Sequence, residues 1–337
     1  MRKIINLPKR VYFTSFSAVG GYHERRCAYG ESFDFCDDTD KFGMKSFEMA
    51  EGAMCSMALK FAMKKAAIDE GALEVLFAGD LQNQCTASAI GLYEFGIPYV
   101  GLYSACSTAT EAIMLLSQLI SAGFVSYGAA VTSSHNSAAE RQFRTPIEYG
   151  AQRTPSAQWT ATAAGAFIMS GQKFRDRCAY VDRVMVGKAV SGLTSDASNM
   201  GAGMARAAYD TIYTFLSLAG EPIDSYSAIV TGDLGRVGSS ILSEMLEKDI
   251  PGAAQRHLDC GAMLYGNNNG VNAGASGCGC SASLLAAHFL PRVERGEIKK
   301  MLFLSTGALM SPGSVQQKND ILGIAPAILI KGDQYDS

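Results

Sequence analysis

Apolar residues recur along the chain in two similar series of helix and strand, one in each half. In the first half, residues 48–67 carry apolar side chains at three- and four-residue spacing, which predicts a helix. The apolar run 75–81 follows it and predicts a buried strand. The second half repeats this order, with a predicted helix over 202–219 and a predicted strand over 228–234. The pattern indicates an internal duplication, which decides the fold before any single motif does.

The match between the halves extends to short motifs and to later segments. The tripeptide Gly-Asp-Leu occurs at 79–81, at the end of the first predicted strand, and again at 232–234, at the end of its counterpart. Two further pairs of strand-like segments match in the same order, namely 128–134 with 301–307 and 164–170 with 324–330.

Helices that alternate with short apolar strands predict parallel sheets covered by helices, so we expect an α/β fold made of two duplicated halves. The charged segment 173–183 fits the connection between them. We therefore divide the chain into an N-terminal half, 1–175, and a C-terminal half, 176–337. No Pro-rich or Gly/Ser-rich linker follows the connection, so the halves should pack together.

Charge and cysteine content narrow the class of protein. Lys and Arg number 29 against 32 Asp and Glu, and the pI is about 5.9, so no nucleic acid partner is expected. The nine cysteines form an odd set without metal-ligand spacing, which indicates a reducing compartment and no metal site. No apolar stretch suits a secretory signal or a bilayer span. We expect a protein that is cytoplasmic or peripheral to a membrane, and not secreted.

The sharpest local signal is the segment 99–111, which reads as a strand, a turn and the start of a helix. Cys106 lies at this corner, where free backbone N–H groups and the positive end of the helix dipole favour a thiolate or bind an anion. Cys106 is therefore a candidate nucleophile or part of an anion site. The alternative is a small buried apolar residue, a common role of cysteine.

A second candidate site is the polar loop after the run 128–134. It holds His135 and Asn136, and Arg144 lies shortly beyond with a planar guanidinium that suits a carboxylate. Ligands bind at strand ends in parallel sheets, so His135 is a candidate ligand contact, although a hydrogen-bonded structural histidine is an equally good interpretation. By the internal repeat, Gly307 lies at the matching strand end and permits a close backbone approach.

The order of these motifs resembles the stage V sporulation protein AD family of the thiolase superfamily. The resemblance extends from about residue 10 to residue 330. The runs that carry it are AGDL (78–81), GLYSACST (101–108), SSHN (133–136), QFR (142–144), EYG (148–150), AQWT (157–160), VTGDLG (230–235), DCG (259–261), AGASG (273–277) and TGAL (306–309).

The resemblance implies a thiolase-like five-layer αβαβα fold and a role in spore-forming bacteria. The family binds dipicolinic acid (pyridine-2,6-dicarboxylate), with calcium, in the pocket where thiolases perform their chemistry. The protein would be a soluble, membrane-associated component of the complex that moves this ligand into the developing spore and out of it during germination. Its partners would be other stage V sporulation A proteins at the spore inner membrane, and the thiolase fold implies a homodimer.

Compared with thiolases, the chain keeps the nucleophile as Cys106 but has other residues at the positions of the proton carriers. Residues 279–281 (Gly-Cys-Ser) occupy the histidine motif, and 305–307 (Ser-Thr-Gly) occupy the late cysteine motif. Residues 232–234 stand where thiolases have an Asn-Glu-Ala-Phe motif and related synthases a histidine. The resemblance therefore implies a binding protein that is not an enzyme and has no cofactor, with Cys106 as a vestigial nucleophile.

The resemblance also implies a ligand-binding set drawn from both halves. Cys106 and the N–H groups that follow it would face one carboxylate of the ligand. His135, Asn136 and Arg144 would meet the other carboxylate or the ring nitrogen. The full expected set is Asp80, Cys106, Ser107, His135, Asn136, Arg144, Cys280 and Gly307, without metal ligands.

Two other classes of function remain open at this point. The first is an acyl-CoA condensing enzyme or thioesterase that uses Cys106 as nucleophile and His135 as an unusual base. The second is a structural scaffold for membrane partners, which would bind no small ligand.

Overall fold

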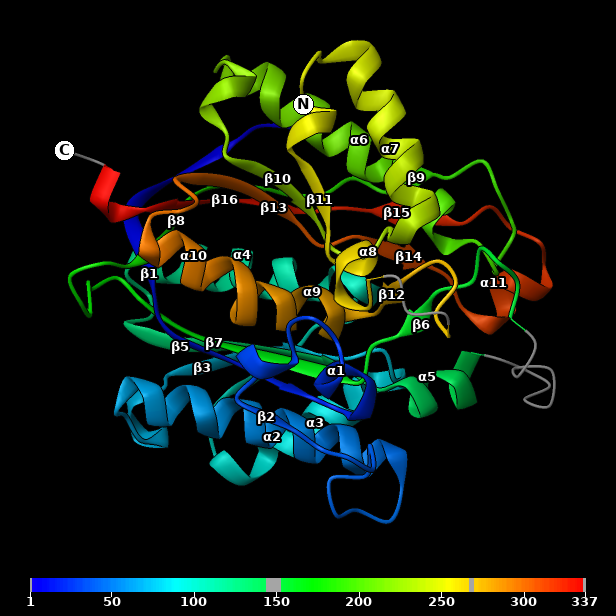
Figure 1. Cartoon of the computed structure of the whole chain (residues 1–337). Coiled ribbons are helices and arrows are strands. Elements are labelled where there is room, and N and C mark those ends of the chain that lie inside the picture. The colour runs from blue at the N-terminus through cyan, green and yellow to red at the C-terminus, as the bar shows by residue number, and fades with distance from the viewer. Residues whose placement is uncertain (1, 144–152, 267–269, 336–337) are drawn as a thin grey trace.

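The computed structural model describes residues 2–143, 153–266 and 270–335, in which helices and sheets alternate in five layers (Figure 1). Helices α2 and α3 form one outer layer, and α6 and α7 form the other. Between them lie two sheets with a central layer that contains α4, α9 and α10 (Figure 1). The expected five-layer αβαβα arrangement is confirmed.

The two sheets have the same strand order and the same strand directions. The first runs β4-β3-β5-β7-β1 and the second β11-β10-β13-β16-β8, each from its outer edge inward. These strands are β1 (Ile5–Gly20), β3 (Val75–Gly79), β4 (Tyr99–Gly101), β5 (Tyr127–Ser134), β7 (Ala163–Ser170), β8 (Ala179–Met185), β10 (Ala228–Thr231), β11 (His257–Asp259), β13 (Lys300–Leu304) and β16 (Ala327–Gly332).

The expectation of parallel sheets is only half right. In each sheet the three outer strands are parallel, but the two inner strands, β7 and β1 or β16 and β8, are antiparallel to their neighbours. Alternation of helix and strand in the sequence does not determine the direction of a strand that needs no crossover helix. Each sheet is therefore mixed.

Hydrogen bonds between β1 and β8 join the two sheets along their inner edges, for example where Tyr12 pairs with Tyr180. The chain passes from the first sheet to the second between β7 and β8, in residues 171–178. The expected boundary at residue 175 falls within this connection. The division into two domains stays a prediction.

The helices agree with the apolar pattern where that pattern is long. The expected helix over 48–67 is α2, and that over 202–219 is α6. The helices are α1 (Tyr22–Arg25), α2 (Phe47–Ala66), α3 (Thr86–Leu92), α4 (Thr108–Ala122), α5 (Asn136–Phe143), α6 (Met200–Ala219), α7 (Gly235–Asp249), α8 (Cys260–Leu264), α9 (Cys278–Leu284), α10 (Leu290–Arg295) and α11 (Pro312–Gln316).

The largest apolar core lies between the two sheets, around α4 and α9. Such a central layer needs helices that are apolar all round, and α4 buries Ile113 and Leu116 completely. Helix α9 instead has small residues that allow close packing: a Cβ added at Gly165 of β7 would lie 2.7 Å from the Ala282 backbone. Separate cores lie under α2 and under α6.

Six short strands complete the described structure: β2 pairs with β1, β6 pairs with β12, and β14, β15 and β9 form a three-stranded sheet. They are β2 (Phe35–Cys36), β6 (Trp159–Thr160), β9 (Val190–Ser191), β12 (Ala275–Ser276), β14 (Gly307–Leu309) and β15 (Leu322–Ile324). Within the described ranges, no helix combines the length and the apolar character needed to cross a bilayer.

Candidate functional site

Cys106 lies at the corner between β4 and α4, as the sequence predicts. A one-turn 3₁₀ helix, Ala105–Ser107, leads directly into α4, so the first N–H groups of that helix are close to Cys106. Ala105 has a φ of 50°, a left-handed conformation that residues with a Cβ rarely adopt. A Cβ added at Gly307 would lie 2.8 Å from the Ser104 carbonyl oxygen. The predicted close backbone approach at Gly307 is confirmed.

The buried carboxyl group of Asp233 lies beside the Cys106 thiol. Asp233 follows β10, and its oxygens accept hydrogen bonds from the Thr306 hydroxyl at 2.7 Å and the Gly277 backbone N–H at 2.9 Å. The Asp259 carboxylate holds this strand end in place, because it accepts hydrogen bonds from the two backbone N–H groups that follow Asp233. The site thus joins one corner of the first half to three strand ends of the second.

Burial dominates the electrostatics of this pair. It raises the pKa of the Cys106 thiol well above the ordinary cysteine value, and the charge of Asp233 raises it further. Burial raises the pKa of Asp233 to about 7, although three hydrogen bonds oppose that shift. A reactive cysteine needs a neighbouring cation or base that favours the thiolate. Here the neighbour is an acid, so Cys106 stays a thiol.

A cavity of about 600 Å³ opens beside Cys106. This volume is within the range of roughly 300–1,000 Å³ that is typical of small-molecule sites. Both halves contribute to the wall, so neither half forms the site alone. Its apolar lining includes Leu81, Ala139, Phe143, Met200, Met310 and Val315. Its polar lining includes Tyr103, Glu140, Gln158, Thr160, Ser198, Ser276, Ser311 and Ser314.

The structure does not bring Asp80 or His135 to this cavity. Asp80 is buried and caps the start of α3, where its carboxylate accepts hydrogen bonds from the backbone N–H and the hydroxyl of Ser88 at 2.8 and 2.7 Å. His135 is 1% exposed. Its Nε2 bonds to the Asp40 carbonyl oxygen at 2.7 Å, and its ring lies 5.3 Å from that of Phe47. This placement agrees with the structural interpretation of His135.

The other expected ligand contacts differ in how close they lie to Cys106. The Ser107 hydroxyl donates to the Ser104 carbonyl oxygen at 2.7 Å, one residue from Cys106. Asn136 begins α5, and its Nδ2 is buried without a hydrogen-bond partner among the described residues. Cys280 is buried in the central core on α9 and does not line the cavity. Arg144 lies outside the described residues.

Three residues at this site, Asp233, Gln158 and Glu140, are not among the ligand contacts expected from the sequence. Asp233 had a signal, because it occupies the position at which related synthases carry a histidine. Gln158 and Glu140 line the cavity but had no individual signal, since each lies in a stretch without a chemical motif. Only the packing of distant segments brings them to one wall.

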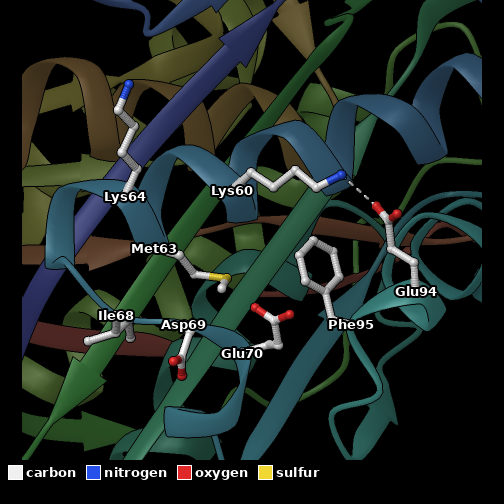
Figure 2. A pocket seen from close by; sticks show the side chains of 8 residues that line it. All are labelled: Lys60, Met63, Lys64, Ile68, Asp69, Glu70, Glu94 and Phe95. Carbon is white, nitrogen blue, oxygen red and sulfur yellow. Dashed lines mark hydrogen bonds and ion pairs between the residues drawn. The ribbon is translucent and has the colours of Figure 1, made fainter.

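Two other kinds of candidate site were considered in the described residues: a metal-binding cluster and a second surface depression. Neither offers a better ligand site than the cavity beside Cys106. No three His, Cys, Asp or Glu side chains of the described chain are grouped so as to hold a metal ion. A depression of about 390 Å³ lies beside α2, where Lys60 and Glu94 form an ion pair at 2.8 Å next to Phe95 (Figure 2). Exposed ion pairs of this kind stabilise little and define no ligand chemistry.

Comparison with known proteins identifies one family across almost the whole chain. The family model described as stage V sporulation protein AD (SpoVAD) matches residues 1–331. Stage V sporulation protein AD of Bacillus subtilis (strain 168) is 35% identical over 321 residues, which cover 95% of this chain and 94% of that protein.

Solved structures of condensing enzymes share the fold at low sequence identity. A variant of OleA from Xanthomonas campestris matches with a TM-score of 0.59 and 11% identity, over 97% of this chain and 99% of that chain. AbyA1, a tetronic acid condensing enzyme, matches with a TM-score of 0.60 and 12% identity, over 95% and 99%. At these identities the likeness shows the fold alone, and it confirms the predicted thiolase-like class.

The raised pKa of Asp233 makes the cost of replacing it depend on pH. The folded protein holds this proton up to about pH 7, whereas the unfolded chain releases it near pH 4, so the stability that the proton contributes is lost as pH rises between these values. Asp233→Asn should therefore destabilise less at pH 8 than at pH 5, by on the order of 1–3 kcal/mol. Urea unfolding at both pH values measures this difference.

The matched control is Asp69→Asn, at an exposed aspartate. Its small cost should be the same at both pH values. An Asp233→Asn cost that is equal at the two pH values, or larger at pH 8, would contradict the assigned electrostatics.

Proposed function

The chain belongs to the stage V sporulation protein AD family, and from this premise we propose that it binds dipicolinic acid without transforming it. The proposed site is the cavity beside Cys106. The bound ligand, with calcium, would then be passed on by the complex that moves it into the developing spore and out of it during germination. The fold of this chain is that of an enzyme superfamily, so the proposal depends on the chemistry of the site itself.

One observation carries the proposal: the group next to Cys106 is the carboxyl of Asp233. A condensing enzyme needs a thiolate and a proton carrier that returns the proton during the reaction. Asp233 opposes the thiolate by its charge, and its own oxygens are occupied by Thr306 and Gly277. What the site keeps is an enclosed space beside a helix N-terminus, and this suits retention of an anionic ligand.

The lining of the cavity supports a flat aromatic ligand with polar ends. Leu81, Phe143 and Met310 offer apolar contact to a pyridine ring. The hydroxyl groups of Thr160 and Ser276 can donate hydrogen bonds to carboxylate oxygens. In this assignment Cys106 contributes a surface of the pocket and not a nucleophile.

A substitution that fills the cavity should abolish binding of dipicolinate. Ala197 lies on the cavity wall and is half-buried, so a tryptophan there would occupy the ligand space without crowding the core. Isothermal titration of the wild type with dipicolinate in the presence of calcium should give saturable heat, and Ala197→Trp should give none. Ala219→Trp, at the far end of α6, is the control and should bind as the wild type does. Absence of heat for the wild type, or equal affinity for Ala197→Trp, would refute the site.

The second candidate function is acyl transfer, which the shared fold and the retained Cys106 favour. It predicts an acyl-enzyme. We expect no adduct when the protein is incubated with acyl-CoAs of several chain lengths and then measured by intact mass spectrometry. A stoichiometric acyl adduct that disappears in Cys106→Ser would favour the enzyme. A pure scaffold would show neither an adduct nor ligand heat.

We further propose that the chain acts as a homodimer, peripheral to the spore inner membrane, together with other stage V sporulation A proteins. The observation that supports a dimer is the outer edge of the first sheet. Strand β4 pairs with β3 on one side, and its Tyr99 and Val100 are 38% and 40% exposed. An edge strand with exposed apolar side chains is suited to pairing with a second copy.

Cross-linking of isolated spore inner membranes, followed by mass spectrometry, tests both associations. We expect links from this chain to other stage V sporulation A proteins and links between two copies of the same peptide near β4. Val100→Lys places like charges at a paired edge, so it should remove the links between copies and keep the others. A chain recovered only in the soluble fraction, without either kind of link, would contradict the proposal.

A further inference from the structure

Three segments that are distant in the sequence adjoin at one end of the molecule. Residues 7–10 bulge out of β1, between the two parts of that strand that pair with β8. The backbone N–H and carbonyl oxygen of Lys9 both bond to the Ser121 hydroxyl, near the end of α4, at 2.9 Å. A Cβ added at the first residue of the connection 171–177 would lie 3.6 Å from Ile120 of the same helix. We call the bulge, the end of α4 and this connection the basic end.

Two exposed phenylalanines lie at the basic end. Phe124 follows α4 and is 79% exposed, and Phe174 lies in the connection after β7 and is 46% exposed. Exposed apolar side chains that are scattered singly are ordinary in a folded protein. Here two of the largest lie on adjoining segments, so both could enter one apolar phase together.

Ion pairs at the basic end have their cations on the outside. The Lys173 amine lies 2.6 Å from the Asp333 carboxylate, and the lysine side chain is 44% exposed whereas that of Asp333 is 4% exposed. Arg175 lies 2.6 Å from Glu294, and the corresponding values are 40% and 17%. The carboxylates therefore lie beneath the cations, and the surface presents the positive members of both pairs.

Three further cations, Lys9, Arg10 and Arg177, are exposed in the same segments. The Arg10 guanidinium lies 4.8 Å from the centre of the Tyr180 ring, a contact that holds it at this end. Asp176 is the one acidic residue of these segments. The whole chain has a formal net charge of −3, so this excess of cations is a local property of the basic end.

We propose that the basic end binds directly to the surface of a bilayer that contains anionic lipid. Phe124 and Phe174 would enter the boundary between headgroups and acyl chains, and the surrounding cations would contact lipid phosphates. Each Lys or Arg close to such a surface favours binding by roughly fivefold. An acidic protein would also attract the cations, but it would need pockets that match both phenylalanines, whereas a bilayer needs no matching shape. The inference goes beyond the proposed function, which assigns no surface to lipid, and it does not depend on dipicolinate.

Helix α4 determines where the cavity lies relative to this surface. It begins at Thr108, two residues after Cys106, and ends at Ala122, two residues before Phe124. Its 15 residues span about 22 Å. Figure 1 shows the connection between β7 and β8 on the opposite side of the molecule from α5 and α11, which border the cavity. A protein bound through the basic end would therefore hold its cavity away from the bilayer, toward the aqueous phase.

Flotation of the full chain with lipid vesicles tests this assignment. We expect the wild type to float with an equal mixture of phosphatidylcholine and phosphatidylglycerol, not to float with phosphatidylcholine alone, and to be released at high salt. The double variant Phe124→Ser, Phe174→Ser should bind the mixed vesicles about tenfold or more weakly, because it loses apolar contact. The double variant Lys9→Gln, Arg177→Gln should lose about as much, because it loses two charges.

The matched control replaces an exposed leucine and an exposed lysine in the loops beside β9 and α11, with Leu193→Ser and Lys318→Gln. It should bind vesicles as the wild type does, and thermal unfolding checks that each variant is folded. A wild type that floats with neither vesicle, or equally with both, overturns the inference and points to a protein partner at this end. Wild-type flotation of both double variants overturns it as well. Titration of the same variants with dipicolinate should match the wild type, so a failure of lipid binding is distinguishable from a failure of the proposed function.

Discussion

The placement of the Cys106 thiol beside the buried carboxyl of Asp233 is the feature on which the chemistry of this site depends. It requires a corner from the first half and a strand end from the second to meet in the dry centre of the molecule. Low polarity there keeps the proton on sulfur and raises the pKa of Asp233 to about 7. The same strand-to-helix corner would generate a nucleophile if a base lay beside the cysteine. Here it holds a neutral thiol beside an acid. The same enclosure leaves a cavity whose wall can hold a ligand.

Hydrogen bonds join the two halves of the chain in the centre of the molecule. The Thr110 hydroxyl of α4 donates to the Ser305 hydroxyl, at the end of β13, at 2.9 Å. The Ser305 backbone N–H donates back to Thr110 at 2.8 Å. Small residues on α9 and β7 let the halves approach closely, as the contact between Gly165 and Ala282 illustrates. The cavity therefore has a fixed wall from each half.

Much of the fold, and one corner of the site, could be predicted from the sequence. The helices α2 and α6, the matching strands of the two halves and the position of Cys106 follow from apolar periodicity and turn residues, which are local properties. Strand direction in β7 and β1 did not follow, because antiparallel neighbours leave no periodic signal. His135 was grouped with Cys106 by its place at a strand end, but its ring turns toward Asp40. Side-chain direction and the meeting of Glu140 and Gln158 at one cavity wall depend on tertiary packing, so no local pattern contains them.

The most direct measurement is a crystal structure of the protein soaked with dipicolinate and calcium. The account predicts density for the ring and both carboxylates in the cavity beside Cys106. The Cys106 sulfur should remain unmodified beside Asp233. An empty cavity at saturating ligand, ligand density at another surface, or a covalent adduct on Cys106 would contradict the account.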